Sequence, residues 1–387
     1  MKLLIYYWTD YWSHDTYDIC SYYNISYDTF EWKFTDKNHD EEFEHWFDTN
    51  ISLKQYDALI SVDYFPLLAE VAHKSNVKYI AWCYDNPLNV LQIEDTLGYP
   101  TNYVFLFDRI QYETYQRKGF QTVYHMPLGV NARRLNKLRP TAAEHQIYDT
   151  EIAFVGKLYI SPIQEILAPL ENYTQGYLKA LIDVQSRIYG YYLFDEILTP
   201  QFIEEINQQY QHKQPGTSFR ISKEALSYAM ASEVARRDRL CLLNLLGRRH
   251  KVTFYSYQHD GLIKNVDMRG PVDYITEMPF AFHCAKININ PTLRIIQSGI
   301  PLRAFDIMGA GGFLLSNWQS ELAELYVDGE EVVMYDSYED AVTKANFYLK
   351  HEDIRKQIAI AGRKKTFEQH DLNHIFRNIM KIAGVDI

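Results

Sequence analysis

The chain has 387 residues, with 39 basic and 50 acidic side chains and a formal net charge of −11. That length predicts two domains, because a single hydrophobic core stops growing beyond roughly 250–300 residues. The acidic balance argues against nucleic acid as a partner, and no apolar run approaches the ~18 residues that span a bilayer. The four cysteines lie far apart without a C-x-x-C pair, which is typical of free thiols in a reducing compartment. We therefore predict a cytoplasmic protein without a transmembrane segment.

Short apolar strands alternate with helical segments through the first 130 residues. This alternation predicts a mostly parallel sheet with helices on both faces. The acidic stretch Asp36–Asp48 is expected to be an exposed helix start and loop. The strands that we expect in this half are Leu3–Tyr7, Ala58–Val62, Tyr79–Cys83, Tyr103–Phe107 and Thr122–His125.

A second series of strands and helices begins after a polar segment around Pro140. From about residue 160 to 249 the hydrophobic period is helical, which predicts a helical insertion in the second sheet. The chain is thus expected to form two Rossmann-like α/β domains facing a cleft, 1–140 and 141–370, with the helix in 371–387 packed back on the first. The strands expected in the second half are Glu151–Gly156, Lys251–Tyr255, Lys286–Ile289, Phe313–Ser316 and Glu331–Tyr335.

Charge and glycine are unevenly distributed along the chain. Residues 1–130 hold 9 basic and 19 acidic residues, whereas residues 131–387 hold 30 and 31. The only tight glycine cluster is Gly309, Gly311 and Gly312. An anionic ligand is therefore expected on the second half, although the acidic half can also be read as a solvated surface.

Several common motifs are absent from the sequence. There is no G-x-G-x-x-G and no G-x-x-x-x-G-K-[ST], which disfavours nicotinamide cofactors and Walker-type nucleotide binding. No two aspartates are separated by one residue, and no H-E-x-x-H or Cys/His cluster suggests zinc. We therefore predict no metal and no cofactor, so that Arg, Lys and backbone N–H groups must neutralise any anionic leaving group.

The segment Lys286–Asn317 contains the strongest indications of a ligand site. Ser298–Pro301 predicts a helix start, where free N–H groups and the helix dipole attract anions. Arg294 and Arg303 add guanidinium groups suited to phosphate. Asp306, one turn into the helix, is placed to accept hydrogen bonds from ribose hydroxyls, or else only to pair with Arg303 and complement the dipole.

Candidate acceptor-side residues follow strands of the first half. Asp85 comes two residues after an expected strand, where a carboxylate can take a proton from a hydroxyl group, or else only cap the turn at Asn86–Pro87. Asp63 and His14 are rival bases that end other strands or loops. Tyr64 lies near a strand end, where its ring can stack on a sugar, although most such aromatic residues belong to a core.

Both halves resemble the CgeB-like (spore-maturation type) glycosyltransferases, which have two Rossmann-like domains in the GT-B arrangement. The resemblance rests on KININPTLRIIQSGIPLRAFDIMGAGGFLLSN and its continuation in the second half, and on SVDYFPLLAEVAHKSNVKYIAWCYDNP, NYVFLFDR and YHMPLGVN in the first. It covers residues from roughly 55 to 130 and 265 to 370. It implies a metal-independent enzyme of the hexosyl- or N-acetylhexosaminyltransferase type. Such an enzyme moves a sugar from a nucleotide sugar, with UDP favoured, to a protein, glycan or small-molecule acceptor.

The resemblance also implies residue roles. Asp306 falls where related enzymes carry a ribose-binding Glu, while Ser298 stands where they carry the first Glu of that pair. FVGKL at 154–158 is similar to an FVGRL turn whose basic residue contacts the diphosphate, which nominates Lys157. Asp85 is the expected base if the reaction inverts the anomeric centre, and a retaining reaction needs no such base. The expected donor-binding residues are Lys157, Arg294, Ser298, Gly299, Arg303, Asp306 and Gly311.

The sequence is also compatible with two other functions. The turn expected at 9–13 contains no glycine and Ser298 departs from the family pattern, which would suit a non-catalytic nucleotide-sugar-binding or scaffold subunit with the GT-B arrangement. A sugar-nucleotide epimerase of the same architecture is the third alternative. The sequence does not specify the sugar, the base, the acceptor, the stereochemistry or the oligomeric state.

Overall fold

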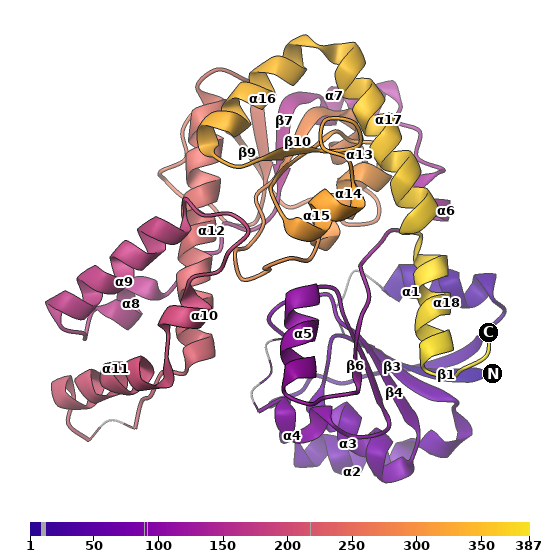
Figure 1. The fold of residues 1–387 in the computed structure, drawn as a ribbon. Helices are drawn as coiled ribbons and strands as arrows, with labels where there is room; N and C mark the ends of the chain where they lie inside the picture. The colour runs from indigo at the N-terminus through magenta and orange to yellow at the C-terminus, as the bar shows by residue number, and fades with distance from the viewer. Residues whose placement is uncertain (9–12, 89, 91, 217) are drawn as a thin grey trace. The chain divides into compact units, whose positions relative to one another are not determined.

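The computed structural model describes residues 1–8, 13–88, 90, 92–216 and 218–387, and it divides into two compact units (Figure 1). Unit 1 comprises Met1–Lys137, Ser298–Gly309 and Lys364–Ile387, and unit 2 comprises Leu138–Gln297 and Ala310–Arg363. Each unit contains one six-stranded parallel sheet. The predicted fold class, α/β with two parallel sheets, is confirmed.

The sheet of unit 1 has the strand order β2-β1-β3-β4-β5-β6. Its central strands are continuously apolar, and all five residues of β3 are buried, as expected for a parallel sheet covered on both faces. The strands are β1 (Lys2–Tyr7), β2 (Ser26–Glu31), β3 (Ala58–Val62), β4 (Lys78–Trp82), β5 (Asn102–Leu106) and β6 (Val123–His125).

Local signals in the sequence delimit the helices of unit 1. Pro66 occupies the first position of α3, and Asn76 ends that helix in the left-handed conformation. Asp40 caps α2, whose Phe43 and Phe47 are buried, so the stretch expected to be exposed has an apolar face. The helices before residue 138 are α1 (Ser13–Tyr22), α2 (Glu41–Asn50), α3 (Pro66–Ser75), α4 (Glu94–Leu97), α5 (Arg109–Arg117) and α6 (Ala132–Leu135), with a 3₁₀ turn at Leu53–Gln55.

Two later segments complete unit 1. Helix α14 (Leu302–Gly309) packs against the segment around Val130, where a Cβ on Gly309 would lie 2.7 Å from Leu135 Cδ1. Helix α18 (Leu372–Ile382) lies beside α1, and Val130 forms a bridge with Asp371 at its start. The structure thus groups Ser298–Gly309 with the first sheet, whereas the sequence suggested the second domain.

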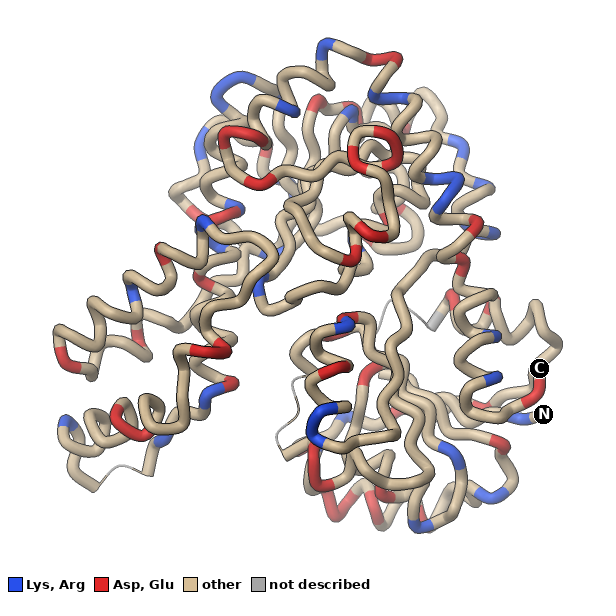
Figure 2. Tube along the Cα trace, viewed as in Figure 1, with Lys and Arg blue, Asp and Glu red and all other residues tan. Residues whose placement is uncertain are grey.

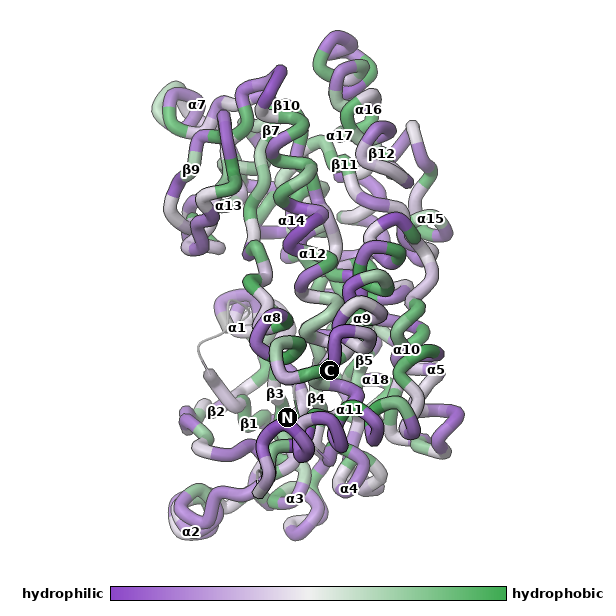
Figure 3. Tube along the Cα trace, turned by 90° about the vertical axis from the view of Figure 1, so that its left-hand side faces the viewer, coloured by the Kyte–Doolittle hydropathy of each residue, from purple (hydrophilic) through white to green (hydrophobic). Residues whose placement is uncertain are grey.

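The sheet of unit 2 has the strand order β12-β11-β10-β7-β8-β9. Figure 3 shows the central strands in green, the apolar colour, with more polar helices around them. The strands are β7 (Thr150–Val155), β8 (Val252–Tyr255), β9 (Asp267–Arg269), β10 (Ala285–Asn290), β11 (Leu314–Asn317) and β12 (Val333–Tyr335).

The helical insertion predicted between β7 and β8 is present. It forms its own apolar cluster around Leu178, Phe194 and Met230, and its last helix, α12, also packs on the sheet. The helices of unit 2 are α7 (Ala142–Tyr148), α8 (Ile163–Leu167), α9 (Asn172–Gln185), α10 (Phe194–Ile197), α11 (Pro200–Lys213), α12 (Lys223–Gly247), α13 (Met278–Cys284), α15 (Ser320–Leu325) and α16 (Tyr338–Lys350), and α17 (Glu352–Gln369) continues into unit 1.

Charged residues lie mainly on the outer helices. Figure 2 shows acidic residues along α2 and basic residues in the second half of α17, where Arg363, Lys364 and Lys365 are consecutive. Within the described parts of the chain, no helix combines the length and the apolar character needed to cross a membrane. The four cysteines are free thiols, of which only Cys241 is exposed.

Candidate functional site

The turn after β7 has a strained backbone. Tyr159 has a φ of 57°, a conformation that bulky side chains rarely adopt. The Gln258 side-chain oxygen holds this turn by accepting hydrogen bonds from the backbone N–H groups of Leu158 (2.6 Å) and Tyr159 (3.2 Å). Lys157, the predicted diphosphate ligand, is exposed on this turn. Strain of this kind is often found at functional sites, which supports the choice of this turn.

A buried arginine ties the same turn to the next strand end. Arg239 of α12 is 6% exposed, and its guanidinium donates to the carbonyl of Lys157 (2.6 Å) and to that of Pro291 (2.8 Å). The guanidinium carbon also lies 4.4 Å from the centre of the Tyr159 ring. Arg239 therefore fixes the ends of β7 and β10 relative to each other.

Polar side chains line the ends of β10 and β11. The Asn317 side-chain oxygen accepts from the Thr292 N–H (2.6 Å), and the Asn290 amide donates to the Ser316 hydroxyl (3.0 Å). The Thr292 hydroxyl donates to the Gln319 side-chain oxygen (3.2 Å). These groups are buried, and ligands of parallel α/β sheets bind at this edge.

Arg294 forms a buried ion pair. Its guanidinium lies 2.8 Å from the Asp238 carboxylate and 3.7 Å from the centre of the Tyr189 ring. Burial raises the pKa of Asp238, and Arg294 and the Tyr338 hydroxyl oppose that rise. The adjoining cavity, bordered by Gly190 and Trp318, has a volume of only about 20 Å³. In this structure Arg294 therefore neutralises Asp238, and its predicted contact with a diphosphate remains a prediction.

Ser298 and Gly299 pack against the end of β5 inside unit 1. Ser298 is fully buried, and its hydroxyl donates to the Asp108 carboxylate (2.8 Å). A Cβ on Gly299 would lie 2.8 Å from Asp108 Cα and 2.9 Å from the Phe107 carbonyl oxygen, so only glycine fits. Both residues have a structural role here, and their donor-binding roles remain predictions.

Arg303 and Asp306 lie together on α14. The Arg303 guanidinium is 3.4 Å from the Asp306 carboxylate, the pairing that was the alternative to ribose binding. The side chain of Arg303 is 29% exposed, whereas that of Asp306 is 9% exposed. A ligand would therefore reach the arginine more easily than the carboxylate.

Two carboxylates interact at the carboxyl edge of the unit 1 sheet. Asp63, after β3, is 5% exposed with a φ of 60°, and one carboxylate oxygen accepts from the N–H groups of Tyr84 (2.8 Å) and Asp85 (3.0 Å). Burial and the negative charge of Asp85 raise the pKa of Asp63 to about 7. Asp85, after β4, is exposed. The structure thus brings two of the predicted acceptor-side residues together, with contrasting environments.

The other acceptor-side predictions have different outcomes. Tyr64 is fully buried, and its hydroxyl donates to the Thr96 hydroxyl (2.9 Å), so the predicted stacking on a sugar is wrong for this conformation. His14 is exposed near the start of α1. The turn predicted at 9–13 falls mostly on residues 9–12, which lie outside the described residues.

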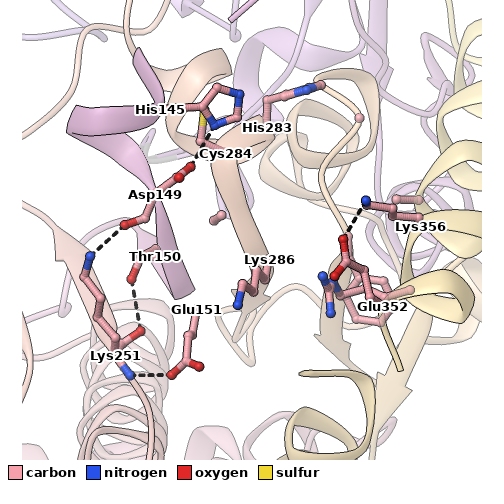
Figure 4. Close-up of a pocket in the computed structure, with 15 residues that line it drawn as sticks. His145, Asp149, Thr150, Glu151, Lys251, His283, Cys284, Lys286, Glu352 and Lys356 are labelled. Carbon is pink, nitrogen blue, oxygen red and sulfur yellow. Dashed lines mark hydrogen bonds and ion pairs between the residues drawn. The ribbon is translucent and has the colours of Figure 1, made fainter. Parts of the chain in front are cut away.

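Gly311 lies at the opposite edge of the unit 2 sheet from the turn after β7. It has a φ of 81° and lines a cavity of about 500 Å³ at the amino ends of β7 and β10 (Figure 4). A Cβ there would lie 3.4 Å from His283 Nδ1. Its backbone conformation explains the glycine, and its position gives the predicted donor contact no support.

Comparisons with known proteins agree with this architecture. A family model described as glycosyl transferase-like matches residues 219–381, and no curated protein matches the chain. The crystal structure of Anabaena HepE in complex with UDP and glucose is similar, with a TM-score of 0.52, 11% identity and 99% of each chain covered. This is the GT-B glycosyltransferase fold.

Two further GT-B-like structures match over the whole chain. Sucrose-phosphate synthase from Thermosynechococcus elongatus has a TM-score of 0.59 at 10% identity, covering 99% of this chain and 98% of its own. T4 phage BGT in complex with its UDP-glucose substrate has a TM-score of 0.55 at 10% identity, covering both chains completely. At identities this low, the structural similarity establishes the fold alone.

Sequence reasoning missed the residues that support the turn after β7 in this GT-B fold. Arg239 lies in the run ARRDRLC, where its neighbours Arg236 and Arg237 pair with Glu233 on the same helix. The available signal was that Arg239 shares a helical face with Leu242, Leu243 and Leu246, which are buried. Gln258 carried no signal, because its role depends on contact between segments about 100 residues apart.

Proposed function

We propose that this chain is a glycosyltransferase that moves a sugar from a UDP-sugar to an acceptor hydroxyl group. The observation that carries the proposal is the match of a glycosyl transferase-like model to residues 219–381 in a chain with the GT-B fold. The matched range includes β8, β10 and α14. It therefore contains most of the predicted donor-binding residues.

UDP is the proposed nucleotide. HepE and T4 phage BGT have been crystallised with UDP-glucose, and both share the fold of this chain. A diphosphate needs cationic partners, and the exposed side chain of Lys157 on the turn after β7 is the proposed one in unit 2. We propose a hexosyl or N-acetylhexosaminyl donor and a CgeB-like relationship.

Asp85 is the proposed base if the reaction inverts the anomeric centre. The exposed carboxylate of Asp85 can accept a proton from an acceptor hydroxyl, whereas Asp63 is buried and already accepts two backbone hydrogen bonds. Asp63 would act as a positioning residue, because it holds the N–H of Asp85 itself. The acceptor class remains a protein, a glycan or a small molecule.

Calorimetry with UDP, GDP and the corresponding nucleotide sugars tests the donor site. We expect UDP to bind and Lys157→Ala to weaken binding at least tenfold, about 1.4 kcal/mol, since a charge-assisted contact is lost. Lys179→Ala, on the exposed surface of α9, is the matched control. Absence of UDP binding by the folded wild-type protein would contradict the proposal.

Donor turnover separates the enzyme from its alternatives. A transferase should release UDP slowly from its UDP-sugar by hydrolysis without an acceptor, whereas a scaffold subunit should bind the donor and leave it intact. An epimerase should convert the donor to another nucleotide sugar under the same conditions. We also expect turnover to persist in EDTA, so a loss that manganese restores would contradict the proposed metal independence.

A further inference from the structure

A group of three potential metal ligands lies at the amino edge of the unit 2 sheet. His145, Asp149 and Cys284 each place one ligand atom within 4.8 Å of the others. The His145 Nδ1 and the Asp149 carboxylate are 2.8 Å apart. Figure 4 shows the three side chains converging at one end of the 500 Å³ cavity, while the ion pair of Lys356 with Glu352 lies across it.

The fold brings these residues together across two adjacent strands. His145 is one helical turn before Asp149, which caps the end of α7 directly before β7. Cys284 is the last residue of α13, directly before β10. In the ladder between these strands Ala285 pairs with Thr150, so that Cys284 and Asp149 stand opposite each other. The cluster is thus built on two rigid junctions.

The three ligand types favour a metal such as zinc over the cations that prefer oxygen ligands. A thiolate, an imidazole nitrogen and a carboxylate suit zinc, whereas magnesium and calcium prefer oxygen ligands alone. With Zn–N near 2.0 Å and Zn–S near 2.3 Å, the ligand atoms of a tetrahedral site lie about 3.3–3.6 Å apart. The present ligand atoms lie within 4.8 Å of one another, and His145 and Asp149 are exposed, which leaves their side chains room to rotate. The open cavity leaves the fourth position to water.

We propose that His145, Asp149 and Cys284 form a divalent-metal site of the zinc class that joins the starts of β7 and β10. The site lies at the amino edge of the sheet, apart from the turn after β7 that carries Lys157. Its role is therefore to stabilise unit 2 rather than to take part in transfer. The inference is independent of the proposed function, because its measurements are metal binding and thermal stability.

Cobalt is the probe that identifies the ligands. Metal-free, reduced full-length protein is titrated with Co²⁺, and we expect thiolate-to-cobalt charge-transfer absorption together with the visible bands of a tetrahedral ion. Cys284→Ser should abolish the charge-transfer absorption, whereas Cys241→Ser, which removes the exposed thiol of α12, should retain it. No charge-transfer absorption in the wild-type protein, or its loss in Cys241→Ser alone, would overturn the site.

Zinc provides the second measurement. Zn²⁺ should raise the Tm of the wild-type protein, and Mg²⁺ at the same concentration should not. His145→Ala should weaken zinc binding at least tenfold without unfolding the chain, because this side chain is half exposed. His212→Ala, in the last turn of α11, is the matched control. Equal zinc affinity in His145→Ala and the wild-type protein would overturn the proposed ligand set.

Discussion

The carboxyl edges of the two six-stranded parallel sheets carry opposite chemistry. In unit 1 an aspartate follows each of three neighbouring strands: Asp63 after β3, Asp85 closely after β4 and Asp108 closely after β5. In unit 2 the carboxyl ends of the strands carry Lys157, after β7, and amide or hydroxyl side chains such as Asn317 in β11. Parallel sheets place these residues at one edge regardless of their identity, so the chemistry depends on the residues and not on the fold.

The two edges are also held together by different means. In unit 1, carboxylates accept backbone N–H groups, as Asp63 and Asp108 do. In unit 2, the guanidinium of Arg239 donates to backbone carbonyls. A sheet edge that carries carboxylates suits removal of a proton from the acceptor hydroxyl. A sheet edge organised by hydrogen-bond donors suits an anionic nucleotide sugar. The following experiments test this contrast, beginning with the largest expected effect.

Arg239→Met should have the largest effect. The substitution leaves the part-buried carbonyl of Lys157 and the buried carbonyl of Pro291 without their guanidinium donors, and we expect a loss of about 3 kcal/mol in the free energy of unfolding. Urea denaturation measures this change. Arg237→Met is the matched control on the same helix, and it should cost about 1 kcal/mol because its side chain is 31% exposed. Equal losses in the two variants would show that Arg239 does not hold the edge.

Asp85→Asn should have the next largest effect, on turnover. The amide cannot take a proton, so in an inverting enzyme we expect kcat to fall about 100-fold, or about 2.7 kcal/mol, with little change in donor affinity. Asp48→Asn, exposed on α2, is the control. Retention of full kcat by Asp85→Asn would remove the residue from the proposed chemistry and would favour a retaining reaction.

Most of the fold could be predicted from the sequence because parallel strands are recognisable as short apolar runs. Ala58–Val62 matches β3 completely, and nine other strands are found within two residues of their ends. Strands β2 and β9 were not predicted. Both lie at sheet edges, where one side is exposed, and SYDTFE and DMR contain too few apolar residues to show a strand pattern.

The candidate site was less predictable because its support comes from contacts between distant segments. Lys157, Asp63 and Asp85 follow strands, which the sequence shows. Burial does not follow from a strand end alone, so Tyr64 was a candidate for stacking on a sugar and is found in the core. The ligand atoms of His145 and Cys284 meet across 139 positions of sequence, so that no spacing pattern could indicate a zinc-class cluster.

The pH dependence of stability tests the Asp63 environment. Its pKa of about 7 lies above its ordinary value, so the folded state holds this proton more strongly than the unfolded state, and stability falls as the pH rises from about 4 to 7. Asp63→Asn keeps an oxygen for the two N–H groups but does not titrate. The free energy of unfolding of Asp63→Asn minus that of the wild-type protein should be about 2 kcal/mol larger at pH 8 than at pH 5.

Comparing Asp63→Asn with the wild-type protein also removes the contribution of other titrating groups in unit 1, because both proteins contain them. Burial lowers the pKa of His370 to about 4, so this group gives the opposite slope in both proteins, with stability lost as the pH falls from about 6.5 to 4. Urea denaturation at both pH values measures the difference. A constant difference between Asp63→Asn and the wild-type protein would contradict the buried, proton-binding state of Asp63.

The smallest expected effect separates the roles of Arg303 and Asp306. Arg303→Ala should weaken UDP binding about tenfold, or about 1.4 kcal/mol, and calorimetry should show no such change for Arg117→Ala at the exposed end of α5. If Asp306 acts only by holding Arg303, adding Asp306→Ala to Arg303→Ala should cost nothing further, whereas a direct bond to ribose should make the two losses additive. We expect additivity, because the 3.4 Å contact between the two side chains is long for a hydrogen bond. If the double variant binds UDP as tightly as Arg303→Ala alone, Asp306 is a positioning residue. The ribose would then be without its proposed partner.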